Sequence, residues 1–265
     1  MKIAVLGPEY SYSHIVGLKL YSGEELVLCE PLEQVFREVV AGAVTKGIVP
    51  IENLKVSHIP ESVDGLLEHD VRINAAYEMP IHHCLAAQGE EYKEIISKKE
   101  ALKQCSRFLV GRKIGYRTST SKAMEDAAKD PYFAAIGSRE AAHHYGLNIL
   151  QENIGNDPHN ATRFLVISLE ETIARENART TLLLQPHEDK PGALFHLLAP
   201  FAVQGINLAK IDSFSSPSGQ KIGEYIFYLE IHGGVEEPRV KSALDFLRNC
   251  ATVRLLGSYD LRELK

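Results

Sequence analysis

The sequence predicts an α/β protein with two lobes, followed by a smaller α+β domain. Through about the first 150 residues, short β-rich runs alternate with amphipathic helical patterns, which is typical of βαβ units with parallel strands. The alternation occurs in two successive blocks. After a charged stretch the order changes to βαββαβ over about 80 residues, which is the ferredoxin-like plan.

The first lobe begins with the strand KIAVLG, which Gly7 and Pro8 end, and a polar loop then leads into the helix HIVGLKLYSG. A second helix, LEQVFREVVAGAV, carries apolar residues at helical spacing, and the strand KGIVPIEN follows it. Because this order predicts parallel strands, we expect the loops at residues 9–13 and 52–57 to lie along one edge of the sheet, where α/β proteins bind ligands.

The second lobe covers roughly residues 76–150. VRINAAYEMPIHHCLAAQG predicts two strands or one long bent strand, and KEIISKKEALKQCSRFL predicts a strand leading into a helix. KIGYRTSTSKAMEDAAKD predicts a strand and a helix capped by Ser119 or Thr120, and FAAIGSREAAHHYGLNIL repeats this theme up to Gly146. Two such lobes joined by crossing strands would face each other across a cleft, where small molecules usually bind.

The last domain follows VISLEETIARENART, a charged stretch that we interpret as a linker. Its predicted strands are TTLLLQP, INLAKIDSFSS, GEYIFYLEIHG and ATVRLLGSYD. Its predicted helices are GALFHLLAPFAVQG, closed by Gly205, and EPRVKSALDFLRNC, with Pro238 in the first turn. We expect a two-lobed domain at residues 1–175, with lobes at about 1–75 plus 155–175 and 76–154, and a last domain at 180–265.

The composition excludes several classes of protein. The 265 residues are 45% hydrophobic and 24% charged, so a folded core is expected. The net charge of −6 and the absence of a basic run argue against a nucleic-acid partner. No apolar run is long enough for a signal peptide or a membrane span, so we expect a cytoplasmic protein. The four cysteines lack the Cys-x-x-Cys spacing of a zinc ribbon or redox pair.

The usual catalytic motifs are missing. Gly7 is not part of a dinucleotide-binding glycine pattern, and the paired histidines at 82–83 and 143–144 would diverge rather than chelate a metal. No serine elbow or matched Cys/His context indicates a covalent nucleophile. What remains is a set of polar residues at predicted loop rims, each of which alone is more common as a cap or turn residue: Asn53, Ser97, Gln104, Ser119, Thr120, Thr162 and Arg163.

Six segments, in the same order, resemble prephenate dehydratases. HNATRFLVI is similar to their Thr-Arg-Phe signature, with an asparagine two residues before the threonine in both. KIAVLGPEYSYSH resembles the opening Gly-Pro-x-Gly-Thr-x-Ser segment, GIVPIEN the Val-Pro-Ile-Glu-Asn strand, and QCSRFL the segment after a Ser-His-Pro motif. TSTSKAM and AAIGSREAAHHYGLNIL match later blocks, and DKPGALFHLLAPFAVQGINLAKIDS resembles the C-terminal ACT regulatory domain.

The resemblance implies a two-lobed catalytic domain like a periplasmic binding protein, followed by an ACT domain. The family converts prephenate into phenylpyruvate, CO2 and water in phenylalanine biosynthesis. Because the ring becomes aromatic as CO2 and hydroxide leave, no cofactor or metal is expected. The protein must assist the departing hydroxide and hold two carboxylates, and general-acid assistance is worth about 10²–10⁴ in rate.

The resemblance also assigns roles to residues. Thr162 matches the catalytic residue, which we read as a hydrogen-bond donor to the leaving oxygen. Arg163 suits bidentate carboxylate binding, but it could equally hold its loop through a protein carboxylate. The expected substrate site comprises Ser11, Asn53, Ser97, Gln104, Ser119, Thr120, Arg163 and Phe164.

Regulation is implied as well, because paired ACT domains in the family bind phenylalanine at their dimer interface and inhibit the enzyme. We therefore expect phenylalanine as an allosteric ligand and a homodimer or homotetramer formed through these domains. Behind Pro191, small residues would leave helix amides exposed for the amino-acid carboxylate. The expected phenylalanine site comprises Gly192, Ala193, Leu194, Asp212 and Ser213.

The chain departs from the family pattern mainly at the substrate rim. Tyr10 stands where the family has glycine, and LKVSHIPES replaces the glycine- and hydroxyl-containing loop after Asn53. Lys98, Lys99 and Glu100 replace His-Pro-Gln, and the second ACT motif lacks its arginine. Arogenate dehydration, a non-aromatising decarboxylation of prephenate, and a non-catalytic amino-acid sensor are therefore the alternatives.

Overall fold

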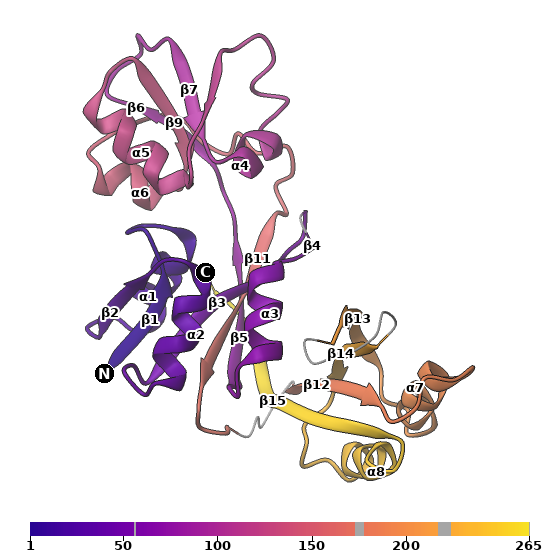
Figure 1. The fold of residues 1–265 in the computed structure, drawn as a ribbon. Coiled ribbons are helices and arrows are strands. Elements are labelled where there is room, and N and C mark those ends of the chain that lie inside the picture. Colours follow the sequence, from indigo (N-terminus) through magenta and orange to yellow (C-terminus); the bar gives the residue numbers. More distant parts are fainter. Residues whose placement is uncertain (56, 173–177, 217–223, 265) are drawn as a thin grey trace.

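The computed structural model describes residues 1–55, 57–172, 178–216 and 224–264. Its strands form a ten-stranded sheet, in the order β13-β14-β12-β15-β5-β11-β3-β1-β2 with β4 paired to β3, and a five-stranded sheet, in the order β10-β6-β9-β7-β8. In Figure 1 the five-stranded lobe lies at the top, the first lobe at the lower left and the last domain at the lower right. The predicted mixed α/β architecture with two lobes is confirmed.

The first lobe contains β1 (Lys2–Leu6), α1 (Tyr12–Leu20), β2 (Glu25–Cys29), α2 (Leu32–Val40), β3 (Lys46–Asn53), β4 (Ser57–His58) and α3 (Pro60–Glu68). β1 pairs in parallel with both β2 and β3, as the βαβ order predicts. The analysis of the sequence missed β2, which is short and partly exposed. It also missed α3, although a proline at the first helical position is a recognised start signal.

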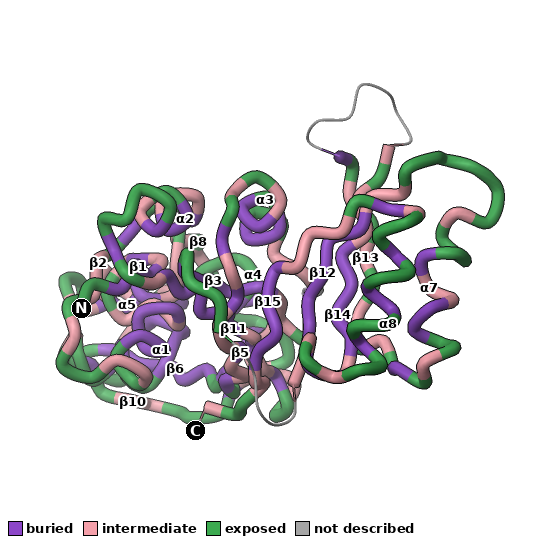
Figure 2. The backbone as a smooth tube through the Cα atoms, turned by 90° about the horizontal axis from the view of Figure 1, so that it is seen from below, coloured by how far each residue is buried: buried purple, intermediate pink, exposed green. Residues whose placement is uncertain are grey.

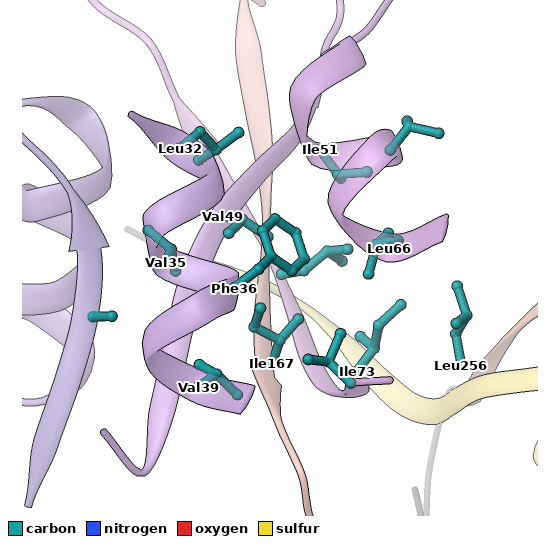
Figure 3. Packing of buried hydrophobic residues seen from close by; sticks show 14 of the residues in the cluster. Leu32, Val35, Phe36, Val39, Val49, Ile51, Leu66, Ile73, Ile167 and Leu256 are labelled. Atoms are coloured by element: carbon teal, nitrogen blue, oxygen red, sulfur yellow. The ribbon is translucent and has the colours of Figure 1, made fainter. Parts of the chain in front are cut away.

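The core of the first lobe lies between α2, α3 and the sheet. Phe36 is fully buried, and Figure 3 shows its ring on the side of α2 that faces α3. The two helices approach closely because Gly65 has no side chain. A Cβ atom at Gly65 would overlap the Phe36 ring. The apolar stripe read from the sequence is confirmed for Leu32, Val35, Phe36 and Val39, whereas Val40 is exposed.

The second lobe contains β6 (Cys84–Ala87), β7 (Glu94–Ser97), α4 (Lys99–Gln104), β8 (Ile114–Tyr116), α5 (Thr120–Lys129), β9 (Phe133–Gly137), α6 (Arg139–His144) and β10 (Asn148–Gln151). β7 runs parallel to β8 and β9, whereas β6 runs antiparallel to β9 and β10. The side chain of Ser119 caps α5, one of the two alternatives that the sequence offered.

Two strands of the large sheet lead to and from the second lobe. β5 (Arg72–Pro80) and β11 (Ala161–Ser168) pair with each other in antiparallel orientation. The chain changes sheets between residues 80 and 84 on the way out and between residues 151 and 161 on the way back. These two crossings form the hinge between the lobes (Figure 1).

The last domain contains β12 (Ala178–Pro186), α7 (Ala193–Val203), β13 (Leu208–Ser215), β14 (Tyr225–His232), α8 (Pro238–Leu247) and β15 (Ala251–Glu263). Its strands are antiparallel in the order β13-β14-β12-β15, which is the ferredoxin-like arrangement that the sequence predicts. Figure 2 shows the buried stretches of β12, β14 and β15 in purple, on the side of the domain away from α7. Part of the predicted linker, residues 173–177, lies outside the described residues.

Strand β15 joins the last domain to the first lobe. Its residues from Ala251 to Asp260 pair with β12, and its end, from Asp260 to Glu263, pairs in parallel with residues 75–78 of β5. The sequence predicts the first part of this strand only. The large sheet therefore runs without interruption from the last domain into the strand that leads to the second lobe.

Candidate active site

The site forms where β11 begins, and the alternation of a strand divides its first residues between two faces. Thr162 pairs with Asn53 of β3 and with Met79 of β5, whereas Arg163 pairs with Glu52 and Glu78. Because successive side chains of a strand point to opposite sides of the sheet, the hydroxyl and the guanidinium face different surroundings. The polar pair that looks like one feature in the sequence is thus two features in the structure.

Asn53 orients the hydroxyl of Thr162. Its Nδ2 lies 2.8 Å from Thr162 Oγ1 and 3.0 Å from the carbonyl oxygen of Ala161, and its Oδ1 accepts a hydrogen bond from the backbone N–H of Lys55 at 2.9 Å. A backbone N–H can only donate and a carbonyl can only accept, so these contacts fix which way the Asn53 amide is turned. Asn53 Nδ2 shares its two hydrogens among Thr162 Oγ1, Ala161 O and Asn160 Oδ1, so Thr162 Oγ1 faces a donor. Among the described residues, the proton of the Thr162 hydroxyl has no acceptor of its own.

A chain of hydrogen bonds continues from Asn53 into the second lobe. Asn53 Nδ2 lies 3.1 Å from Asn160 Oδ1, and Asn160 Nδ2 lies 3.2 Å from Gln104 Oε1 at the end of α4. Gln104 Oε1 also lies 2.9 Å from His83 Nε2, and His83 Nδ1 lies 3.2 Å from the hydroxyl of Tyr12. The six side chains from Thr162 to Tyr12, called the polar chain below, connect α1, β3, β11 and the hinge with α4.

The sequence predicts three members of the polar chain, Asn53, Gln104 and Thr162, and misses the other three. Asn160 entered only as a neighbour in the Thr-Arg-Phe motif, and His83 was considered only as a metal ligand. Both are buried, with 4% and 3% of their surfaces exposed. His83 comes directly before the apolar run Cys84–Ala87, and this was the available signal, because buried polar groups need partners. Asn160 lies in a polar segment, which gives no such signal.

A cavity of about 550 Å³ lies beside the polar chain. Gln104, Asn160 and His83 line it together with Ile81 and residues 155–157. Lys55, Lys99 and Lys103 line it too, against the carboxylates of Glu100 and Asp157. Lys55 pairs with Asp157, so the excess positive charge lies on α4, where Lys99 and Lys103 are one turn apart. The lining of this cavity is therefore polar with an excess of positive charge.

Several residues expected to bind substrate are engaged elsewhere. Ser11 caps α1, and its hydroxyl donates to the carbonyl of Leu6. Ser97 is fully buried and donates to the carbonyl of Ile136 at 2.6 Å, and Phe164 lies in the apolar core of the first lobe. Direct substrate contact by Ser97 and Phe164 is not supported, because neither side chain has a surface to offer.

Ser119 accepts a hydrogen bond from the backbone N–H of Lys122, and Thr120 is the first residue of α5. Neither residue lines the 550 Å³ cavity. Their expected contact with substrate remains a prediction.

Arg163 meets protein carboxylates. Its guanidinium lies 2.8 Å from Glu52, 2.7 Å from Glu78 and 3.1 Å from Glu230 of β14 in the last domain. Burial raises the pKa of Glu230, and the positive charge of Arg163 opposes this shift. Of the two alternatives for Arg163, the structure supports the second: it ties β11 to the last domain, and the expected substrate contact is not supported.

The first loop contacts the second lobe through Tyr10. Tyr10 has a φ of +55°, a backbone conformation that favours glycine, which is the residue that the family has here. Its ring stacks on His144 of α6 at 3.9 Å, and its backbone N–H donates to His14 Nδ1 at 2.9 Å. Where a glycine would leave the loop flexible, Tyr10 instead forms a contact between the two lobes.

The residues expected to bind phenylalanine lie in the last domain, in two separate elements, the start of α7 and strand β13. Gly192, with a φ of +88°, precedes α7 and offers no side chain to its first turn, where Ala193 and Leu194 begin the helix. Asp212 and Ser213 are neighbours on β13, so their side chains face opposite sides of the sheet. The carboxylate of Asp212 lies 3.6 Å from Lys210 Nζ, which also pairs with Glu52 of the first lobe.

Two buried thiols and the arrangement of possible metal ligands can be assessed in the described part of the chain. Burial raises the pKa of Cys84 to about 11 and that of Cys105 to about 12, so both thiols are protonated at neutral pH. Across residues 1–55, 57–172, 178–216 and 224–264, no group of three or more His, Cys, Asp or Glu side chains could hold a metal ion. No helix within these ranges is long and apolar enough to cross a membrane.

Fold and site together define a two-lobed α/β protein with a polar, positively charged cavity between its lobes. The family model of prephenate dehydratase matches residues 3–172, which is more than half of the chain. The chain therefore belongs to the prephenate dehydratase family.

Individual relatives agree with this assignment. The chain is 35% identical to a bifunctional chorismate mutase/prephenate dehydratase of Stutzerimonas stutzeri, over 98% of this chain and 73% of that protein. It is 32% identical to arogenate dehydratase/prephenate dehydratase 1 of Arabidopsis thaliana, over 98% of this chain and 72% of that protein. The solved structure of prephenate dehydratase from Arthrobacter aurescens in complex with L-Phe matches with a TM-score of 0.87 and 29% identity, over 98% of this chain and 90% of that one.

Proposed function

We propose that this protein catalyses the decarboxylating dehydration of prephenate. The bond between the ring and its carboxylate breaks and releases CO2, and its electron pair enters the ring. The bond from the opposite ring carbon to its hydroxyl breaks at the same time, so the ring becomes aromatic. The departing hydroxide takes up a proton and leaves as water, and the products are phenylpyruvate, CO2 and water.

The observation that carries this proposal is the geometry of Thr162. Asn53 donates to its oxygen at 2.8 Å, which leaves the hydroxyl proton to point toward a leaving group. A hydroxyl that accepts a hydrogen bond is polarised and becomes a better donor in return. Thr162 therefore assists departure of hydroxide through a hydrogen bond that strengthens as negative charge develops on the leaving oxygen.

Thr162 does not itself line the 550 Å³ cavity, but it is joined through Asn53 to Asn160, which does, and the cavity would recognise the substrate carboxylates. Gln104 and Asn160 provide amides, and Lys99 and Lys103 provide positive charge at the rim of α4. A neutral donor set near the ring carboxylate is appropriate, because that group loses its charge as CO2 forms. Strong cationic pairing there would stabilise the ground state more than the transition state.

The test is turnover of prephenate at neutral pH, followed by the appearance of phenylpyruvate. We expect Thr162→Ala to lower kcat by at least about tenfold, because the leaving hydroxide loses its donor. Thr162→Ser keeps the hydroxyl and should retain more activity than the alanine variant. Thr45→Ala, which changes an exposed threonine away from the polar chain, is the matched control.

A wild-type rate no higher than the spontaneous conversion would disprove the proposed reaction and favour a non-catalytic sensor. Turnover to a non-aromatic product would identify a decarboxylase instead. A near-normal rate in Thr162→Ala would remove the proposed role of this hydroxyl while leaving the reaction itself in place.

Arogenate is the second candidate substrate, because relatives of similar identity carry the name arogenate dehydratase. Arogenate has an ammonium group where prephenate has a keto group. Lys99 and Lys103 at the rim would repel this ammonium and so favour prephenate. We expect kcat/KM to be higher for prephenate, and the preference to shrink in the Lys99→Gln/Lys103→Gln double variant.

We also infer that residues 180–265 form an ACT regulatory domain, which follows a catalytic domain at residues 1–175 and pairs with a second copy in a homodimer or homotetramer. Its ferredoxin-like topology and the likeness to a solved relative in complex with L-Phe support this inference. Phenylalanine would bind at the start of α7, at Gly192, Ala193 and Leu194, with Asp212 and Ser213 contributing from β13. The test is a phenylalanine titration of prephenate turnover combined with sedimentation of the protein.

A further inference from the structure

His83 lies at the hinge between the lobes and lines two cavities. One is the 550 Å³ cavity beside the polar chain, and the other, of about 320 Å³, is lined by Tyr12, Met79 and Pro80 among others. Both ring nitrogens of His83 have partners: Nδ1 faces the hydroxyl of Tyr12, and Nε2 faces Gln104 Oε1. A buried imidazole held at both nitrogens is fixed in position.

The direction of each hydrogen bond follows from one backbone group. The N–H of Lys55 can only donate, so the atom of Asn53 that faces it is the oxygen, and Asn53 Nδ2 faces Asn160. Asn160 therefore presents its oxygen to Asn53 and its nitrogen to Gln104. Gln104 must then accept at Oε1, and the same atom faces His83.

This order determines the tautomer of His83. Because Gln104 Oε1 has no proton to give, His83 Nε2 must carry one and donate it. Nδ1 of the neutral ring is then the acceptor that faces Tyr12. Burial lowers the pKa of His83, which is consistent with a neutral ring at neutral pH.

The consequence lies on the opposite side of the Gln104 amide. With Oε1 held by both His83 and Asn160, the NH2 group of Gln104 is turned away from the polar chain. Gln104 lines the 550 Å³ cavity, so we infer that this group can donate hydrogen bonds to a ligand there. Without the proton on His83 Nε2, the amide could rotate and present an oxygen to an anionic ligand, which would repel it.

We propose that His83, as the Nε2–H tautomer, is a positioning residue that holds the Gln104 amide with its NH2 group toward a substrate carboxylate. The proposal rests on the proposed function, because it assigns the ligand of Gln104 as a carboxylate of the substrate. Tyr12 supports the same arrangement by facing Nδ1 with a hydroxyl that can donate to it.

The kinetic test is a double-variant cycle. His83→Phe should raise KM for prephenate about three- to tenfold with little change in kcat, since a correctly turned amide binds substrate and transition state alike. In a Gln104→Leu background, His83→Phe should have almost no further effect on KM, because there is no amide left to orient. His83→Gln, which also offers an N–H, should restore most of the affinity. His82→Phe, at the exposed neighbouring histidine, is the matched control.

The second readout is independent of turnover. Nitrogen-15 NMR of the histidine rings distinguishes a protonated from a bare ring nitrogen, and we expect His83 Nε2 to be protonated and Nδ1 bare. A Nδ1–H tautomer, or KM effects of His83→Phe and Gln104→Leu that simply multiply, would overturn the proposal. Wild-type protein without prephenate turnover would defeat the proposed function instead, and the tautomer would still show whether His83 orients Gln104. If His83→Phe does not fold, His83→Gln and the NMR measurement decide.

Discussion

Single residues of this protein take their roles from the face of the sheet to which they point. Thr162 and Arg163 are adjacent, yet one joins the polar chain and the other pairs with three carboxylates. Asn53 and Glu52 repeat this division on the neighbouring strand. A substitution at one position should therefore affect the chemistry of the site, and a substitution at the next should affect the packing of the domains.

His14 makes the stability of the protein depend on pH. Its Nδ1 accepts the backbone N–H of Tyr10, and burial lowers the pKa of His14 below its ordinary value of 6.5. The unfolded chain thus binds a proton more readily than the folded protein between these two values. The contribution of His14 to the free energy of unfolding should be fully present above about pH 6.5. It should be lost as the pH falls from this value through the lowered pKa of the folded protein.

The measurement is urea unfolding at several values between pH 5 and pH 7.5. His14→Asn, whose side-chain oxygen can replace Nδ1 as an acceptor, should make the dependence shallower, although His83 and His232, whose pKa values are also lowered, keep part of it. His187→Asn, at an exposed histidine, is the control. A slope that is the same in His14→Asn and in the wild type would contradict the assignment.

Among the elements, strand β15 pairs with β12 over most of its length and with β5 at its end. Its register with β12 shifts next to Gly257, three residues before its pairing with β5 begins at Asp260. A Cβ atom at Gly257 would overlap the backbone carbonyl oxygen of Ile73 in β5. Glycine is therefore required for the close approach of two strands, and not for an unusual backbone angle.

We expect Gly257→Ala to lower the free energy of unfolding by about 1–3 kcal/mol, because backbone atoms must move apart to accept the methyl group. Chemical denaturation measures this change. Gly89→Ala is the control, because a Cβ atom at Gly89 meets nothing within 4 Å. Equal effects of the two substitutions would mean that β15 does not pack closely on β5.

At the scale of the whole molecule, the last domain is tied to the first lobe by the continuous sheet and by charge. Glu230 has 3% of its side-chain surface exposed and lies within 3.1 Å of Arg163, while Arg179 and the hydroxyl of Tyr259 lie nearby. Lys210 adds a second bridge, to Glu52. A ligand that shifts β13 or β14 would therefore act on the residue next to Thr162, which is a physical route for regulation.

Glu230→Ala should lower the free energy of unfolding by about 3 kcal/mol, since it removes the buried carboxylate that pairs with the half-buried Arg163 and Arg179. Inhibition by phenylalanine should weaken in the same variant if the last domain acts through this contact. Glu236→Ala, which removes an exposed ion pair with Lys241 in the same domain, should change stability by less than about 0.5 kcal/mol. Similar losses in both variants would contradict the coupling.

The local patterns of the sequence predict most elements, because apolar periodicity depends on neighbours within a few positions. β3, α2, β11 and the βαββαβ order are confirmed, and Gly7, Gly146 and Gly205 mark real ends. β2 and α3 were missed, because one is a short, partly exposed strand and the other lies in a segment interpreted as an altered substrate loop. The end of β15 was missed because its partner, β5, lies about 185 residues earlier.

What the sequence determined by itself is the class of fold and the family, and it also predicts Thr162 as the residue for the chemistry. These follow from short-range periodicity and from motifs that are read in order along the chain. Only the tertiary structure decided that Asn160, His83 and Tyr12 complete the polar chain, and that Arg163 pairs with Glu230. The bond between Asn53 and Asn160 spans 107 positions, and that between Arg163 and Glu230 spans 67. Because partners at such separations are chosen by how lobes and strands pack, no local pattern can contain them.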